Sequence, residues 1–399
     1  MIGRGARRGV LLLAAVALAV PAAGLAATPA GAAVAPDLSV STTYLTGLDH
    51  PWDIAFLPDG TLFVTERPGR LDVRVPGGAL HTLEAPSDVL PGGEGGMLGL
   101  AVDPLFASNR WVYTCFSSTA GGTPDNRLVR WTVNADFTAT VGRTDIVTGL
   151  PYSTGRHSGC RPRFGPDGAI WIGTGDTAVG TVPQSLTSLG GKVLRVDRDG
   201  NPAAGNPTLG VGSDPRIYNY GHRNMQGLAF RPGSGAPFGV EHGTDRDDEV
   251  NRLVAGGNYG WDPNGAGGTY DESQPMTDFT KFPAAIGAVW SSGYPTIAPS
   301  GATFLSGPQW KGWDGALAVA VLKNTELRLM FLDGAGLTVT TQYTVPQLDL
   351  GVRLRSAVQG PDGNLYITTD DGAGAVWKVR PFTRGHRERR LRAATGSVS

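Results

Sequence analysis

One turn-and-strand unit occurs three times along the chain, near its start, near its middle and near its end. Each copy places Pro-Asp-Gly before an apolar run, in residues 56–65, 164–173 and 359–368. An Asp-Gly turn between strand-like runs is a strong hairpin signal. Recurring hairpins in a chain of 399 residues predict radial repetition of four-stranded sheets, which is a β-propeller. A pair of β-sandwiches is the alternative, but it does not account for the same unit at both ends.

The composition also favours an all-β domain. The chain has 59 Gly and 29 Pro, and residues 36–382 contain no convincing amphipathic segment of helix length. Short runs of β-branched and aromatic residues alternate there with turn signals. We therefore expect residues 36–382 to fold as strands joined by tight turns.

The two ends of the chain differ from this body. Three arginines within the first eight residues precede an apolar run from Val10 to Val20 and small residues up to Ala35. This order predicts a signal peptide over residues 1–35 and a secreted, extracellular or periplasmic, mature protein. A membrane anchor is the alternative, but the apolar run is too short and ends at Pro21. Residues 383–399 are basic, so we expect a disordered tail, with adhesion to a surface as the alternative.

The charge of the body argues against nucleic acid as a partner. The whole chain carries a net charge of −1. Three arginines in residues 1–35 and an excess of four positive charges in residues 383–399 leave −8 on residues 36–382. An acidic body is a poor nucleic-acid binder. No other window is apolar enough to cross a bilayer, so we predict no membrane span.

The two cysteines, Cys115 and Cys160, would lie in an exported protein, where a disulfide can form. We favour a bond between them over two free thiols, although the sequence does not show that they meet. The six histidines show no paired ligand spacing, so we expect no transition-metal site.

A histidine and an aspartate flank the second copy of the repeated unit. His157 lies in a Gly/Ser loop just before it, and Asp176 follows its strand. In a propeller, such a loop can face the central channel, and the aspartate can return to hold the second ring nitrogen of the histidine. A histidine held in this way can act as a general base. A histidine bonded within an ordinary turn is the alternative, and spacing alone favours it.

Two further segments are candidates for ligand binding. Residues 243–249 form an acidic, Gly-containing loop that could offer several oxygens to Ca²⁺, although a solvated acidic turn has the same pattern. Arg223 and Asn224 follow Gly221, and an isolated pair of this kind would usually bridge two blades. A cation beside a guanidinium would suit an anionic ligand with carbonyl and carboxylate groups.

Three basic residues near the C-terminal end complete the candidate site. Lys323 ends an apolar strand-like run. Arg353 and Arg355 alternate with Leu354, so both are expected to project from one face of a strand. Considered alone, each of these three residues would be expected to form a salt bridge at the rim of the propeller.

These segments together resemble a known family. The runs are Tyr218-Asn-Tyr-Gly-His-Arg-Asn-Met-Gln-Gly227, Glu241-His-Gly-Thr-Asp-Arg-Asp-Asp-Glu-Val-Asn251 and Gly257-Asn-Tyr-Gly-Trp261. They resemble the secreted sugar dehydrogenases that use pyrroloquinoline quinone (PQQ), the soluble glucose/aldose dehydrogenase family. The likeness extends from about residue 45 to residue 381. It implies a six-bladed β-propeller with four-stranded antiparallel blades.

The resemblance implies a role for each candidate residue. His157 matches the family's general base, and Asp176 matches the partner that orients it. Arg223 and Asn224 match residues on the quinone, where the guanidinium would stabilise a developing oxyanion. Glu94 matches a polar position on the cofactor or substrate side.

The resemblance also implies metal and cofactor ligands. The carbonyl oxygens of Gly243 and Thr244 would hold a catalytic calcium ion. A second, structural calcium ion would take Asp248, Glu249 and the carbonyl oxygen of Tyr259. Further positions match clamps for a tricarboxylate cofactor and a wall of its pocket: Lys323, Arg353, Arg355, Tyr294 and Thr296.

The implied function is the PQQ- and Ca²⁺-dependent oxidation of the anomeric hydroxyl of aldoses to lactones. His157 would remove the hydroxyl proton while a hydride passes to the quinone, and the electrons would leave to an unidentified acceptor. A calcium-dependent sugar-lactone hydrolase and a non-catalytic binding propeller are the alternatives. Neither needs the Lys/Arg clamp, so the clamp favours the dehydrogenase. Because the loops between blades look short, we expect an open site and a broad range of aldoses.

Overall fold

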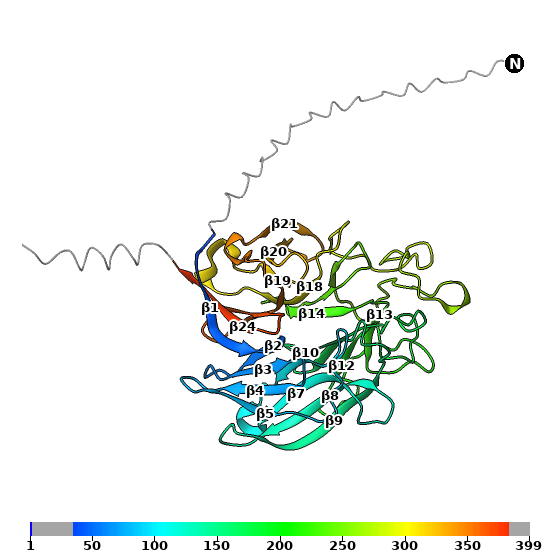
Figure 1. Cartoon of the computed structure of the whole chain (residues 1–399). Helices are drawn as coiled ribbons and strands as arrows, with labels where there is room; N and C mark the ends of the chain where they lie inside the picture. The colour runs from blue at the N-terminus through cyan, green and yellow to red at the C-terminus, as the bar shows by residue number, and fades with distance from the viewer. Residues whose placement is uncertain (2–34, 383–399) are drawn as a thin grey trace, which may run out of the picture. The chain divides into compact units, whose positions relative to one another are not determined.

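The computed structural model describes Met1 and residues 35–382. Residues 37–382 form six sheets of four strands each (Figure 1), in which every paired strand runs antiparallel to its neighbour. The innermost strand of each sheet packs against the innermost strands of the sheets on either side. This is the predicted six-bladed propeller. The predicted signal peptide and basic tail lie outside the described residues, except for Met1 and Ala35.

Blades 1 to 3 follow one another in chain order, each from its innermost to its outermost strand. Blade 1 contains β2 (Pro51–Phe56), β3 (Leu62–Glu66), β4 (Arg70–Arg74) and β5 (Leu80–Glu84). Blade 2 contains β6 (Met97–Val102), β7 (Trp111–Ser118), β8 (Asp125–Val133) and β9 (Thr140–Leu150). Blade 3 contains β10 (Gly159–Phe164), β11 (Ile170–Thr174), β12 (Lys192–Val196) and β13 (Ile217–Tyr220).

Blades 4 to 6 continue the ring. Blade 4 contains β14 (Met225–Phe230), β15 (Pro237–Glu241), β16 (Glu249–Arg252) and β17 (Trp290–Ser291). Blade 5 contains β18 (Pro299–Phe304), β19 (Leu317–Val321), β20 (Leu327–Leu332) and β21 (Val339–Thr344). Blade 6 contains β22 (Leu354–Gln359), β23 (Leu365–Thr369), β24 (Gly374–Phe382) and β1 (Asp37–Leu48).

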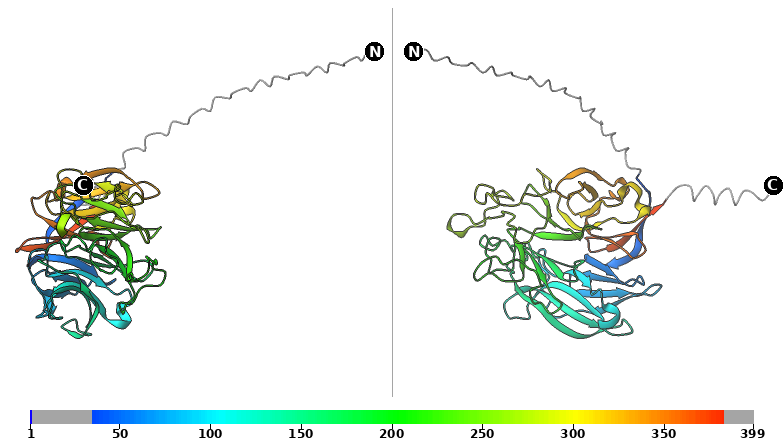
Figure 2. Two further views of the ribbon diagram at one scale, coloured as in Figure 1. Left: turned by 90° about the vertical axis from the view of Figure 1, so that its right-hand side faces the viewer. Right: turned by 180° about the vertical axis from the view of Figure 1, so that it is seen from behind.

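The ring closes through the first and last strands. β1 pairs antiparallel with β24, with Asp37 opposite Phe382, so the start of the described chain supplies the outermost strand of the last blade. The dark blue and red strands therefore lie side by side in Figure 1 and in both views of Figure 2. Closure of this kind leaves no long unpaired edge between the last blade and the first.

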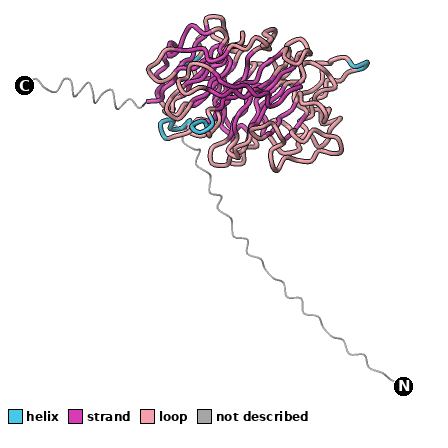
Figure 3. Tube along the Cα trace, turned by 90° about the horizontal axis from the view of Figure 1, so that it is seen from below, coloured by secondary structure: helices cyan, strands magenta, loops and turns pink. Residues whose placement is uncertain are grey.

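Helical structure is limited to short pieces among strands and loops (Figure 3). These pieces are α1 (Phe106–Asn109), η1 (Ala266–Gly268), η2 (Pro308–Trp313) and η3 (Pro346–Leu348). Within the described part of the chain, no helix has the length and apolarity needed to cross a membrane.

Each Pro-Asp-Gly unit forms the turn from the innermost strand of a blade to its second strand, in blades 1, 3 and 6. The Asp side chain of each turn accepts a bond from the backbone N–H two residues later, at 2.8 Å in the first copy and 3.1 Å in the other two. The glycine of each turn has a positive φ, 92° at Gly60 and 76° at Gly168 and Gly363. Glycine adopts this conformation without steric cost, which explains the repeated motif.

The apolar core lies between neighbouring blades, and a disulfide joins two of them. One buried cluster combines Leu128 of blade 2 with Ile172 and Leu194 of blade 3. Cys115 of β7 and Cys160 of β10 lie in the same cluster and are bonded to each other, with Cα atoms 5.4 Å apart. The bond favoured from the sequence is thus present, and it crosses from blade 2 to blade 3.

The innermost strands begin at one end of the ring, which we call the upper end. Residues just before β6, β10 and β14 meet there, since Asn224 contacts both Glu94 and Gly159. Because each second strand runs antiparallel to the first, the residues that follow β11 and β15 reach the same end. About half of the predicted site residues come from these positions: Glu94, His157, Asp176, Arg223, Asn224, Gly243, Thr244 and Asp248.

Candidate active site

His157 and Asp176 meet at the upper end of blade 3. Gly159 at the start of β10 pairs with Thr174 at the end of β11, which brings the residues before one strand beside those after the other. His157 Nδ1 lies 2.8 Å from Asp176 Oδ1, and the two residues are 3% and 0% exposed. With Nδ1 bonded to the carboxylate, Nε2 remains available as a proton acceptor.

The turn that carries His157 has an unusual backbone. His157 and Cys160 have positive φ angles of 49° and 64°, in a region that non-glycine residues rarely adopt. A Cβ atom at Gly175 would lie 1.7 Å from the His157 carbonyl oxygen, so only glycine fits there. The disulfide at Cys160 and the bond from Gly159 N to Asn224 Oδ1, at 3.2 Å, hold the same turn.

The Asp176 carboxylate has two further side-chain partners that the sequence did not predict. Trp261 Nε1 and the Tyr270 hydroxyl each donate to Oδ2 at 2.7 Å. Trp261 lies in a motif that the sequence had singled out, so its importance could have been suspected. Tyr270 lies in the long connection from β16 to β17, where no pattern points to it.

Arg223 and Asn224 lie directly before β14 and face the same end. Arg223 Nη1 donates to the carbonyl oxygen of His242 at 3.3 Å, and Nη2 lies 3.5 Å from Glu272. Asn224 Nδ2 donates to Glu94 Oε2 at 2.9 Å, so the structure brings together two residues predicted for the cofactor side.

The predicted basic residues fall into two groups. Arg355 and Arg353 both reach Asp370 Oδ2, at 2.8 and 3.4 Å, which agrees with projection from one face. Arg355 also donates to Gln226 at 3.2 Å and is nearly buried, whereas the Arg353 side chain is half exposed. Lys323 follows β19 of blade 5 and donates to Thr296 Oγ1 at 3.3 Å.

The pocket-wall residues Tyr294 and Thr296 differ in exposure. Tyr294 is 75% exposed, and Thr296 is buried. The backbone N–H of Thr296 donates to the Asp245 carbonyl oxygen at 3.1 Å, which fastens this wall to the predicted calcium loop.

The Asp248 side chain braces the loop predicted to bind calcium. Its Oδ1 accepts from Gly243 N at 2.9 Å, and its Oδ2 accepts from Ile297 N at 2.6 Å and Ala298 N at 2.8 Å. These bonds hold the backbone beside Gly243 and Thr244. Within residues 35–382, neither of those two carbonyl oxygens accepts a protein hydrogen bond. Two free, adjacent carbonyl oxygens are suitable ligands for Ca²⁺.

The residues predicted for the second, structural calcium ion are a less suitable set of ligands than the two carbonyl oxygens of Gly243 and Thr244. Among the residues that the structure describes, no group of three or more His, Cys, Asp or Glu side chains is arranged to hold a metal ion. Glu249 accepts from Asn251 at 3.1 Å, and its burial and the nearby Glu241 carboxylate raise its pKa well above the ordinary value. The Tyr259 ring stacks on His222, with centroids 4.4 Å apart.

Among residues 35–382, several polar atoms at the upper end are buried without a partner in that range: Arg223 Nε, Arg355 Nε, His242 Nε2 and Asp370 Oδ1. His242 was not predicted from the sequence. Burial, together with the charges of Arg355 and Arg223, lowers the pKa of His242 to about 3, so its ring is neutral at neutral pH. Guanidinium groups that keep an unsatisfied Nε–H, as Arg223 and Arg355 do, suit an anionic ligand such as a tricarboxylate.

Comparison with known proteins identifies the family. The sequence model of the family described as Glucose / Sorbosone dehydrogenase matches residues 48–378. The chain belongs to this family. It is 31% identical over 346 residues to the aldose sugar dehydrogenase YliI of Escherichia coli, covering 84% of this chain and 91% of that protein.

Two more relatives share most of their length with this chain. Quinoprotein glucose dehydrogenase B of Acinetobacter calcoaceticus is 28% identical over 416 residues, covering 84% of this chain and 86% of that protein. The PQQ-bound form of an aldose sugar dehydrogenase from Streptomyces coelicolor is similar in structure. Its TM-score is 0.70 at 31% identity, covering 87% of this chain and 99% of that one.

The centre of the propeller is filled by buried side chains. Arg161 Nη1 and Ser356 Oγ both lie 2.8 Å from Asp53 Oδ1, and all three residues are fully buried. Asp53 belongs to blade 1 and Arg161 to blade 3. Because these blades are not neighbours, their contact crosses the centre and closes the channel below the site.

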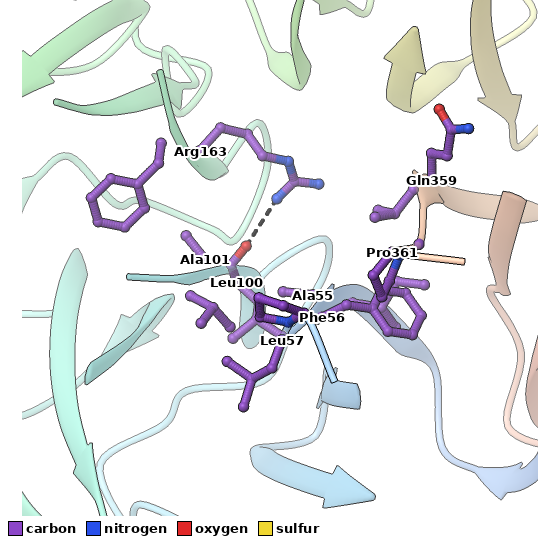
Figure 4. Close-up of a pocket in the computed structure, with 14 residues that line it drawn as sticks. Ala55, Phe56, Leu57, Leu100, Ala101, Arg163, Gln359 and Pro361 are labelled. Atoms are coloured by element: carbon purple, nitrogen blue, oxygen red, sulfur yellow. Dashed lines mark hydrogen bonds between the residues drawn. The ribbon is translucent and has the colours of Figure 1, made fainter. Parts of the chain in front are cut away.

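The lower end of the channel holds a separate cavity of about 430 Å³ (Figure 4). The lower ends of β2, β6, β10 and β22 line it, together with residues of the first and third Pro-Asp-Gly turns. Its charged lining residue, Arg163, donates to the Leu100 carbonyl oxygen at 2.9 Å and pairs with Asp53 at 2.7 Å. The Arg163 guanidinium therefore already has partners inside the protein, and it shares the Asp53 carboxylate with Arg161.

Proposed function

We propose that the chain oxidises the anomeric hydroxyl of aldoses to lactones, with PQQ and Ca²⁺ bound at the upper end of the channel. The buried His157–Asp176 pair beside an incompletely bonded Arg223 carries the proposal. The names of the relatives, an aldose sugar dehydrogenase and a quinoprotein glucose dehydrogenase, support the substrate and cofactor classes.

In this proposal, His157 Nε2 accepts the proton of the sugar hydroxyl. Asp176 keeps Nδ1 protonated and stabilises the imidazolium that results. The C1 hydrogen leaves as hydride, so the sugar loses one proton and one hydride and becomes a lactone. When bound, PQQ would supply the two-electron acceptor and Ca²⁺ the Lewis acid that polarises it. The electrons would then pass from the reduced cofactor to a further acceptor.

The other residues would hold and orient the cofactor. The carbonyl oxygens of Gly243 and Thr244 would bind Ca²⁺, in the loop braced by Asp248. Basic and polar groups would bind the carboxylates and carbonyls of PQQ: Arg223, Asn224, Lys323, Arg353 and Arg355. A sugar-lactone hydrolase or a binding propeller has no use for so many cationic donors at one end of the channel.

Reconstitution tests this proposal. Purified protein without cofactor is titrated with PQQ in Ca²⁺, and PQQ absorbance and dye reduction by aldoses are measured. We expect saturable binding and sugar-dependent dye reduction, both lost when EDTA removes Ca²⁺. Absence of PQQ binding in Ca²⁺ would contradict the proposal. Lactone hydrolysis without PQQ would favour the hydrolase instead.

We also propose that the mature protein is exported and that residues 1–35 are its signal peptide. The buried Cys115–Cys160 disulfide supports this, because such bonds persist mainly in oxidising compartments. Mass spectrometry of secreted material should find a mature N-terminus near residue 35, and an uncleaved cytoplasmic chain would contradict it.

The structure changes the basis on which the substrate range was expected to be broad. The connections between blades are short, as expected, but residues 253–289 form a long connection inside blade 4 that reaches the site. An open site can therefore no longer be inferred from loop length. Broad aldose use stays a proposal, to be checked by comparing kcat/KM across several aldoses.

A further inference from the structure

The long connection of blade 4 supplies side chains to a site built mainly by other blades. After β16, part of it runs beside the last strand of blade 3, where Tyr259 N donates to the Tyr220 carbonyl oxygen at 2.9 Å. It then passes over the upper end, and Tyr270 and Glu272 reach the groups around His157. In Figure 1 this connection includes the yellow-green loops at the right.

The Tyr270 hydroxyl is placed between the two members of the His157–Asp176 pair. It donates to Asp176 Oδ2 at 2.7 Å and lies 3.3 Å from His157 Nδ1. Burial and the charge of Asp176 raise the pKa of Tyr270, so the hydroxyl keeps its proton and acts as the donor.

The Asp176 carboxylate is thereby fixed at both oxygens. Oδ1 accepts from His157 Nδ1 and, at 2.8 Å, from Ala178 N. Oδ2 accepts from Trp261 Nε1 and Tyr270, each at 2.7 Å. A carboxylate held in this way cannot rotate about its side-chain bond without breaking several bonds. Its Oδ1 therefore stays in line with the imidazole.

We propose that Tyr270 is a positioning residue for the general base, acting through Asp176. This inference rests on the proposed function, because it gives His157 the role of base. Tyr270 belongs to the long connection of blade 4 and not to a sheet. This connection must therefore be docked on the upper end for Tyr270 to hold the His157–Asp176 pair.

Two ion contacts dock the loop near Tyr270. Glu272 pairs with Arg156, which lies in the turn that carries His157, and it also lies 3.5 Å from Arg223. The Arg156 guanidinium is 5.9 Å from the centre of the Tyr270 ring. Both Arg156 and Glu272 are partly exposed, so these contacts guide the loop without contributing much stability.

The test compares Tyr270→Phe, which removes only the hydroxyl, with Ser273→Ala. Ser273 bonds to Asp271 within the same loop at 2.6 Å and makes no contact with Asp176, so it is the matched control. The first readout is the downfield Nδ1–H proton signal of His157 in the apoprotein, measured by NMR. It does not require cofactor or turnover, so it separates this inference from the proposed function.

We expect the His157 signal to shift or broaden in Tyr270→Phe and to stay in place in Ser273→Ala. In protein loaded with PQQ and Ca²⁺, kcat should fall about 10-fold, as expected for losing one hydrogen bond to a charged group. KM and the Kd of PQQ should stay within about threefold of wild type. In an Asp176→Asn background, Tyr270→Phe should cause no further loss of kcat.

Three results would each overturn the inference. One is an unchanged His157 signal with unchanged kcat in Tyr270→Phe. Another is an equal loss in Ser273→Ala, which would show that any change in the loop has the same effect. The third is a full additional loss of kcat in the Asp176→Asn background, because Tyr270 would then act independently of Asp176. If the His157 signal shifts in Tyr270→Phe but the wild-type protein oxidises no aldose, the proposed function is contradicted and the positioning role of Tyr270 is not.

Discussion

Single side chains at the centre of the propeller decide how its blades are held together. Asp53 accepts from Ser356 and pairs with Arg161 and Arg163, so one carboxylate joins blades 1, 3 and 6. Burial alone would raise the pKa of Asp53, but the two guanidinium groups outweigh it and hold the pKa well below its ordinary value of 3.8. A paired carboxylate of this kind contributes stability only while it is ionised.

We therefore predict that Asp53→Asn lowers Tm strongly at neutral pH, because the fully buried Arg161 and the partly buried Arg163 lose their shared carboxylate. Breaking a buried pair in this way typically costs about 3–5 kcal/mol. Because the folded pKa is lowered, the contribution is complete well above pH 3.8 and is lost as the pH falls below that value. The difference in Tm between wild type and variant should then narrow in acid.

The exposed Asp136→Asn serves as the control and should leave Tm unchanged at every pH. A Tm difference between wild type and Asp53→Asn that stays constant from neutral pH to pH 3 would contradict the account.

At the residue scale, the sequence predicted contacts that follow from local chain geometry. His157 and Asp176 flank one hairpin, so their meeting could be expected from strand pairing. Asp53 and Arg161 lie in different blades, and Tyr270 lies in a loop without regular pattern. Such contacts depend on how whole blades are placed, and no spacing along the sequence encodes that.

Among the structural elements, the turns and the disulfide fix local geometry. The Pro-Asp-Gly turns could be predicted because Asp and Gly have a direct conformational role in them. The disulfide ties β7 to the start of β10, next to the turn in which His157 has a positive φ. A strained turn of this kind persists only when its surroundings over-determine it.

Removing the disulfide should loosen both the fold and this turn. The bond closes a sequence separation of 45 residues, for which loop-closure entropy gives about 4 kcal/mol of stabilisation. We expect Cys115→Ala/Cys160→Ala to melt at lower temperature than wild type in oxidising buffer. Wild type that has been unfolded and refolded in a reducing agent should have the same Tm as the double variant.

The double variant is its own control, because a reducing agent should not change its Tm. Equal melting temperatures for wild type and double variant would contradict a stabilising role. The stabilisation by the disulfide does not depend on the proposed function, so the melting temperatures can be measured on protein without cofactor.

At the scale of the whole molecule, the propeller gathers residues from distant repeats at one end of a closed channel. Glu94, His157, Arg223 and Arg355 come from blades 2, 3, 4 and 6 or the segments just before them. The repeated turns predicted the architecture, and the resemblance supplied the number of blades. The long connection in blade 4 escaped prediction because a loop that docks by a few side chains has no periodic pattern.

The measurement that tests the central claim most directly uses His157→Ala, with the exposed His81→Ala as control. Both variants are loaded with PQQ and Ca²⁺, and bound PQQ and aldose-dependent dye reduction are measured on the same samples. Because Arg223, Arg355 and the carbonyl loop remain intact, His157→Ala should bind PQQ as wild type does. Its kcat should fall by at least about 100-fold, the usual contribution of a general base. Wild-type turnover in His157→Ala would contradict the account.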